Sequence, residues 1–121
     1  MASEISDMIF APLGQTFVVQ STSSAPTGIQ VKPTGIYDSK AIAQYRIYNS
    51  GTSIAYLGYG LTAASAQTNA DSSTNYASGN PGDAIPIAPG SIEILNFGVD
   101  LYFSSRSATN ANIFITPGEG L

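Results

Sequence analysis

The chain of 121 residues contains no cysteine, no histidine and no tryptophan. Without cysteine it can form neither disulfides nor thiolate metal sites. Without histidine it can build neither a Ser-His-Asp nor a Cys-His nucleophile, nor any imidazole metal site. These absences exclude most hydrolases, and a chain free of cysteine suits folding in a reducing cytoplasm.

Charge is also scarce, because only 10% of the residues are charged, against about 25% in an average globular protein. The net charge is −4, and the only cations, Lys32, Lys40, Arg46 and Arg106, lie far apart in the sequence. Nucleic-acid affinity depends on Lys and Arg that neutralise phosphates, so we expect no nucleic-acid partner. The polar surface must come from Ser, Thr, Asn and Gln, which are cheap to desolvate and therefore favour contact with other protein.

Long apolar runs are missing as well, since no stretch reaches 18 consecutive apolar residues. The N-terminal MASEISDMIF carries Glu4 and Asp7 where a secretory signal needs positive charge. We therefore expect no membrane partner and no secretory signal, and a protein made in the cytoplasm. The length predicts one domain.

Short β-type runs are plentiful, whereas no window of a dozen residues has the apolar spacing of a helix. Strands are expected at residues 16–21, 28–32, 42–49, 53–59, 84–87, 91–97, 100–104 and 111–116. Turns such as Asn49-Ser50-Gly51-Thr52 and Ala88-Pro89-Gly90 are too short for parallel crossovers. The pattern predicts an all-β, antiparallel sandwich or barrel of about eight strands.

Alternation distinguishes inward from outward side chains, and it places Ile92 and Ile94 on one face of their strand. Several other strands carry bulk on both faces, as where Tyr102 opposes Leu101 and Phe103. We therefore expect the second face of at least one sheet to be covered by the other sheet, a loop or another subunit.

Two segments do not fit the strand pattern. Residues 1–14 are too apolar for a free tail, so they form either an edge strand of the 15–121 domain or an arm docked on a partner. Residues 61–83 are polar and rich in Ala, and form one long loop, either mobile or an ordered contact loop. The candidate protein-contact residues in these segments are Ile5, Met8, Ile9, Phe10 and Tyr76.

No motif carries catalytic chemistry. Ser39-Lys40 lies in a polar turn, and no spacing recommends a carboxylate pair. The oxygen-rich residues 71–75 lack the calcium-loop pattern. Gly58-Tyr59-Gly60 lacks the third glycine of a dinucleotide loop. We expect no catalytic residue, no cofactor and no metal, and hence no enzyme.

Three phrases of strand, glycine turn and strand occupy residues 45–60, 85–98 and 111–121. In the segments 46–60 (RIYNSGTSIAYLGYG), 85–94 (IPIAPGSIEI) and 113–121 (IFITPGEGL), they resemble the small decoration proteins, also called cement or head-stabilising proteins, of tailed bacteriophages. The resemblance covers roughly the C-terminal two-thirds of the chain.

This resemblance implies a β-sandwich of jelly-roll type and a homotrimer on the exterior of the capsid in the virion. Such a protein binds the major capsid protein and reinforces the shell against the pressure of the packaged DNA. Two alternatives stay open. One is a carbohydrate-binding or receptor-binding module of a virion that uses Tyr59 and Tyr76, and the other is a tail or head-completion structural protein.

Overall fold

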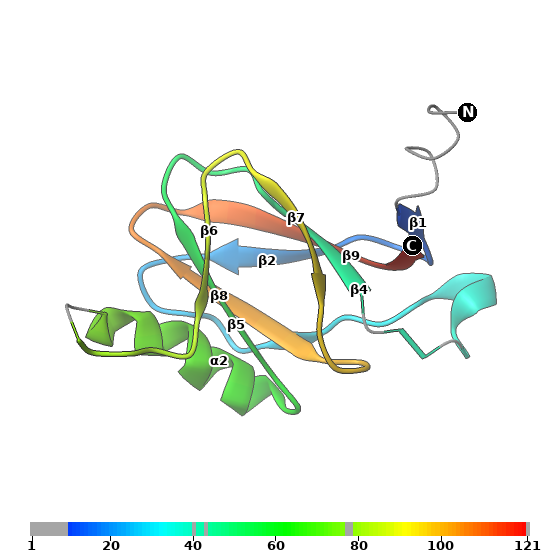
Figure 1. The fold of residues 1–121 in the computed structure, drawn as a ribbon, viewed down its shortest axis with the longest axis horizontal. Coiled ribbons are helices and arrows are strands. Elements are labelled where there is room, and N and C mark those ends of the chain that lie inside the picture. The colour runs from blue at the N-terminus through cyan, green and yellow to red at the C-terminus, as the bar shows by residue number, and fades with distance from the viewer. Residues whose placement is uncertain (1–9, 40, 43, 77–78, 121) are drawn as a thin grey trace.

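The computed structural model describes the chain except for residues 1–9, 40, 43, 77–78 and 121, so the candidates Ile5, Met8 and Ile9 lie outside the described residues. The described part of the chain folds mainly into β-strands (Figure 1). The strands are β1 (Phe10–Pro12), β2 (Phe17–Ser21), β3 (Ile29–Gln30), β4 (Gln44–Asn49), β5 (Ala55–Gly60), β6 (Ile85–Ile87), β7 (Ile92–Asn96), β8 (Tyr102–Ser107) and β9 (Ala111–Gly120). The helices are η1 (Gly35–Tyr37), α2 (Ala63–Asp71) and η2 (Ser72–Asn75).

The strands form two antiparallel sheets, which confirms the predicted all-β class. In sheet A, β9 and β4 are central, β7 flanks β4, and β2 and β1 pair with successive halves of β9. Sheet B has the order β3-β8-β5-β6. The pairing is nested: β2 pairs with β9, β3 with β8, β4 with β7 and β5 with β6. The chain therefore runs out and back as one long hairpin, and alternate pairs of strands fall in the two sheets.

One hydrophobic core lies between the sheets and is supplied by alternate positions of the strands, as the period of two requires. Its fully buried side chains include Tyr45, Ile47, Leu57, Phe103, Ile113 and Ile115. The rings of Tyr45 from sheet A and Phe103 from sheet B meet edge to face, with centroids 4.9 Å apart. The inner faces of both sheets thus share one set of contacts, in a sandwich-like arrangement.

The eight expected strands are all present, but β9 runs beyond Thr116 through a proline and a glycine where the sequence suggested a turn. Gly118 allows this, because a Cβ there would lie 2.3 Å from the ring of Phe10. Leu13 continues the contact by donating its N–H to the Pro117 carbonyl (2.9 Å). Of the two alternatives for the N-terminal segment, the described part is an edge strand of its own sheet.

The expectation that residues 61–83 form a loop without a helix is wrong, because α2 and η2 occupy residues 63–75. Thr62 begins α2 with a capping box, in which its hydroxyl accepts from the Ser65 N–H and the Ser65 hydroxyl accepts from the Thr62 N–H. Only Ala66 and Ala70, one turn apart, are buried on α2. Two methyl groups make too weak an apolar stripe to be recognised as helical periodicity.

Helix α2 lies on the outer face of sheet B, against β5 and β8 (Figure 1). Glycine makes the approach possible, because a Cβ on Gly58 would lie 2.2 Å from the Ala70 nitrogen and 2.4 Å from the Ala66 oxygen. The helix backbone therefore rests directly on the strand backbone. The second face of sheet B is covered by the chain itself.

Candidate protein-contact surface

The described residues offer no assembled chemical site. Within them, no three His, Cys, Asp or Glu residues are grouped so that they could hold a metal ion. No helix in the described part of the chain is long and apolar enough to cross a membrane. In the oxygen-rich segment 71–75, the Asp71 carboxylate accepts a hydrogen bond from the Ala25 N–H (2.8 Å) and so holds a neighbouring segment in place.

A row of four apolar side chains crosses the outer face of sheet A. Val18 on β2 is paired with Phe114 on β9, Phe114 with Tyr48 on β4, and Tyr48 with Ile92 on β7. The pairing is in register, so neighbouring side chains lie on the same face about 5 Å apart. The rings of Tyr48 and Phe114 stack with centroids 6.0 Å apart and planes inclined by 19°. We call these four residues the apolar row.

The apolar row is open to solvent at both ends. Val18 is 42% exposed and Ile92 is 50% exposed, and the neighbouring Ile94 is 40% exposed. In the described part of the chain the one α-helix lies on sheet B, so no α-helix covers this face. An apolar strip across four strands is more than the scattered exposed residues of an ordinary surface.

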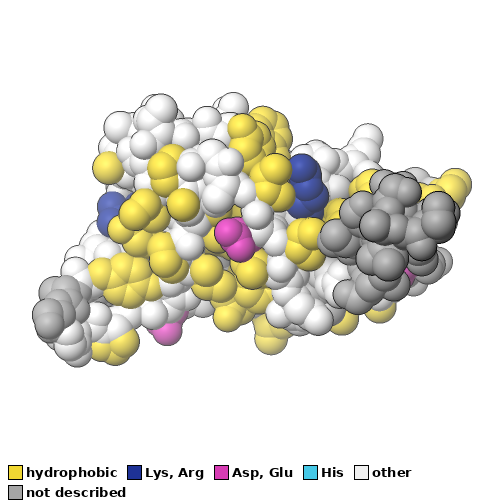
Figure 2. Space-filling view, turned by 45° about the horizontal axis from the view of Figure 1, so that its top comes forward, with side chains coloured by type: hydrophobic (Ala, Val, Ile, Leu, Met, Phe, Trp, Pro, Cys, Tyr) yellow, Lys and Arg dark blue, Asp and Glu magenta, His cyan; other side chains and the backbone are white. Residues whose placement is uncertain are grey.

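Mainly uncharged polar groups border the row. On one side Arg46 is the single charged residue, paired in register with Thr116, whose hydroxyl lies 2.7 Å from that of Thr16. On the other side Gln20 and Asn112 face each other across β2 and β9. Figure 2 shows one face of the molecule on which charged side chains are few and isolated among apolar and uncharged ones. An apolar centre with a polar rim that carries little charge has the composition of a protein interface.

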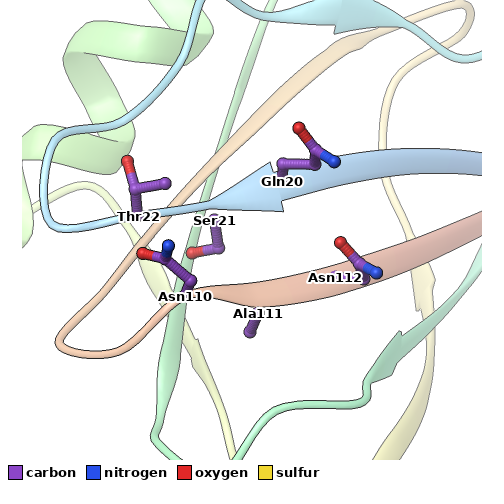
Figure 3. A pocket seen from close by; sticks show the side chains of 6 residues that line it. All are labelled: Gln20, Ser21, Thr22, Asn110, Ala111 and Asn112. Atoms are coloured by element: carbon purple, nitrogen blue, oxygen red, sulfur yellow. The ribbon is translucent and has the colours of Figure 1, made fainter.

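A polar pocket of about 370 Å³ adjoins this rim where β2 ends and β9 begins. Its lining consists of Gln20, Ser21, Thr22, Asn110, Ala111 and Asn112. In Figure 3 the amides of Gln20 and Asn112 extend from neighbouring strands to the same side. The lining holds amide and hydroxyl groups without an aromatic ring. Its hydrogen-bonding groups suit a neutral polar ligand.

The described candidates make contacts within their own chain. Phe10 lies in β1, where its ring covers Gly118. Tyr76 follows η2, donates its hydroxyl to the Ala84 carbonyl and lies 5.7 Å from the Tyr56 ring, yet 37% of it is exposed. Tyr59, considered for sugar stacking, packs on Phe97 with ring centroids 4.4 Å apart. The structure does not bring these residues together on one surface.

The pKa of Tyr45 is raised from its ordinary value. Burial, and to a lesser extent the charge of Asp100, raise the pKa of Tyr45 above 10.0. Its hydroxyl donates to the Gly98 carbonyl (3.1 Å) and accepts from the Leu101 N–H (3.2 Å). These bonds hold the reversal in which Asp100 has a left-handed φ of 53°. The role of Tyr45 is therefore structural.

The apolar row was not identified from the sequence, although the signal was present. Bulk on both faces of a strand indicated a second covered face, and Phe114 lies between the core residues Ile113 and Ile115. The alternation in β7 separated Ile92 and Ile94 from Glu93, but the isoleucines face outward and Glu93 shares the side of Ile47. Sequence alone cannot say which face of an edge strand is the solvent face.

Comparison of the chain with protein-family models, with curated proteins and with solved structures finds no match.

Proposed function

We propose that this protein is a structural, non-enzymatic virion protein that binds the outside of a phage capsid and reinforces the lattice of major capsid subunits. The observation that carries the proposal is the apolar row with its polar rim, in which charge is scarce, a surface suited to burial against protein. The capsid as the partner rests on the sequence resemblance described above.

The connectivity supports the same proposal at the level of fold. From β2 onward, the first strand pairs with the last, the second with the last but one, and so on to β5 and β6. A long hairpin rolled into two sheets in this way has the connectivity of a jelly roll, which is common in viral capsid proteins and also in lectins. Fold alone does not decide function, so the surface must carry the argument.

The energetics favour several contacts acting together. Fully burying an aliphatic side chain contributes about 1.5–3 kcal/mol, so the half-exposed Val18, Ile92 and Ile94 would contribute about 1 kcal/mol each. Association costs at least about 4 kcal/mol, so one copy would bind weakly through these residues. A homotrimer would raise the effective concentration of the second and third copies. Ile5, Met8, Ile9 and Phe10 are proposed as further contacts, to the capsid or between subunits.

The test is occupancy on particles. Purified protein is added to capsids that lack it, and bound copies are counted by quantitative mass spectrometry. We expect a fixed ratio to the major capsid protein, amounting to hundreds of copies per particle. Val18→Thr combined with Ile92→Thr should reduce occupancy, because the variant loses apolar surface that would be buried against the capsid. The fold should stay intact, because both side chains are largely exposed to solvent.

The matched control is Ile36→Thr, since Ile36 is 87% exposed in η1, outside sheet A. It should leave occupancy unchanged. A dozen copies or fewer per virion would instead support the tail or head-completion alternative. Equal binding by the double variant and the wild type would refute the role of the apolar row.

The second candidate, a carbohydrate-binding or receptor-binding module, is favoured only by the polar pocket of Figure 3. Sugar sites commonly add an aromatic platform to their hydrogen bonds, and Tyr59 and Tyr76 do not line this pocket. Glycan-array binding that is lost in Asn112→Ala would support this candidate. Silence on the array together with capsid binding would dismiss it.

A further inference from the structure

The edges of the two sheets differ in how well they are protected against pairing with other strands. Strand β3 has only two residues, and β6 carries Pro86, which has no N–H to donate. Strand β7 has five residues, IEILN, without proline or lysine. Among the described strands, it pairs with β4 alone and ends its sheet. One edge of β7 therefore presents a row of backbone groups that no described strand pairs with, and Glu93, on the side of Ile47, is the one charged residue of the strand.

The hydrogen bonds at the start of β7 show which residues present that edge. The Asn49 N–H donates to the Ser91 carbonyl (3.1 Å), and these residues continue the register in which Ile47 faces Glu93. In an antiparallel pair, alternate residues direct both backbone groups to the same neighbour. Glu93 and Leu95 therefore bond to β4, and the N–H and carbonyl groups of Ile92, Ile94 and Asn96 point away from it.

We propose that this edge pairs with the same edge of a second copy, antiparallel, with Ile94 on the two-fold axis. This register places Ile94 opposite Ile94 and Ile92 opposite Asn96, so that all three outward-pointing residues of each copy are bonded. Each such pair exchanges two hydrogen bonds, about six in total. The two copies of sheet A become one continuous sheet.

Charge and side chains select the same register. It sets Glu93 of one copy opposite the apolar Leu95 of the other. A shift by two residues in one direction sets the two Glu93 carboxylates directly opposite, which is repulsive. A shift the other way pairs Ile94 with Asn96 and leaves Ile92 unbonded. In the selected register Ile92 and Ile94 of both copies form one cluster on the outer face, which extends the apolar row across the dimer.

The contact is small. A pair of five-residue strands buries less than the roughly 1,200 Å² of a stable interface. We expect the dimer to form in solution at about 0.1–1 mM and to be favoured wherever copies are concentrated on a surface. The inference does not depend on the proposed function, because it is tested on the isolated protein.

The absence of cysteine makes a clean cross-linking test possible. In Ile94→Cys, the two sulfhydryls face each other across the axis, with Cα atoms about 5.5 Å apart. In the control Ile92→Cys, the two cysteines are offset by four residues, about 13 Å along the strands. Oxidation or a short bismaleimide should give a covalent dimer with Ile94→Cys at least tenfold faster than with Ile92→Cys. Equal rates, or no dimer with either variant, would overturn the proposal.

A second variant separates backbone pairing from apolar contact. Ile94→Pro removes an N–H that makes no bond to β4, so the chain should still fold, as circular dichroism would verify. Sedimentation equilibrium should show loss of the dimer in Ile94→Pro and its partial retention in Ile94→Thr, which keeps the N–H. A wild-type protein that shows no concentration-dependent association up to about 1 mM, or an association unchanged by the proline, would contradict the pairing.

Discussion

Adding one methyl group at Gly58 tests how α2 is held on the sheet. In Gly58→Ala the new Cβ would lie 2.2 Å from the Ala70 nitrogen and 2.4 Å from the Ala66 oxygen. Both are backbone atoms of α2, so no flexible side chain can move aside. The helix must shift as a body, or β5 must bend.

The expected cost follows from two opposing effects. Forcing a methyl group into a packed site costs about 1–3 kcal/mol, whereas replacing glycine by alanine in a strand regains about 0.5–1 kcal/mol of backbone entropy. Because the obstacles are backbone atoms, we place the net loss near the upper part of this range, about 2 kcal/mol. For a domain of this size, 2 kcal/mol lowers the melting temperature by about 8 °C.

The assay is urea and thermal unfolding followed by far-ultraviolet circular dichroism and tyrosine fluorescence. Gly98→Ala is the matched control, because its Cβ would lie 3.5 Å from the Leu101 side chain, an ordinary contact. The control should be neutral or slightly stabilising. If Gly58→Ala unfolds within about 0.5 kcal/mol of the wild type, the close seating of α2 on β5 is wrong.

Two further predictions concern buried polar groups. Tyr45→Phe removes the bonds to Gly98 and Leu101 and should cost about 1–3 kcal/mol in urea unfolding. Because the pKa of Tyr45 is raised above 10.0 in the folded state, its contribution is full below pH 10 and is lost as the pH rises through the higher folded value. A pH series should show that Tyr45→Phe lacks this alkaline loss, and an identical decline in both proteins would contradict it. Asn49→Ala should lower the free energy of unfolding by about 2–4 kcal/mol. The buried Asn49 amide donates to the carbonyls of Ser53 and Ile87 (2.9 and 3.0 Å) and accepts from the Gly51 N–H (2.9 Å). A loss under about 1 kcal/mol would show that water replaces these bonds.

The strands were predictable because their signals are local. Alternating apolar residues, as at Ile113 and Ile115, and glycine-bearing turns, as at Gly90 with its φ of +76°, act within a few residues of each other. The expected turn at Ala88-Pro89-Gly90 is present and is closed by a hydrogen bond from the Ser91 N–H to the Ala88 carbonyl (3.1 Å). Helix α2 was not predictable in the same way, since its burial depends on close backbone contacts with Gly28, which is distant in sequence, and with Gly58 of β5.

The candidate surface was harder to predict for a related reason. Val18, Tyr48, Phe114 and Ile92 come from four separate strands, and each is adjacent in sequence to a buried or strand-pairing residue. Their alignment into one row depends on register, which the turns constrain only for neighbouring strands. Strands β2 and β9 pair although they are far apart in the sequence, so no short turn between them sets their register.

The sequence by itself determined that the chain is antiparallel all-β, poor in charge and without histidine or cysteine chemistry, because composition and local periodicity suffice for these conclusions. Only the tertiary structure decided which sheet face is covered by α2, which face has no α-helix over it among the described residues, and which edge of β7 has no described strand beside it. These features arise from contacts between segments far apart in the sequence. The scarcity of charge predicted a protein that binds other proteins. The apolar row on sheet A is the surface that we propose for this contact.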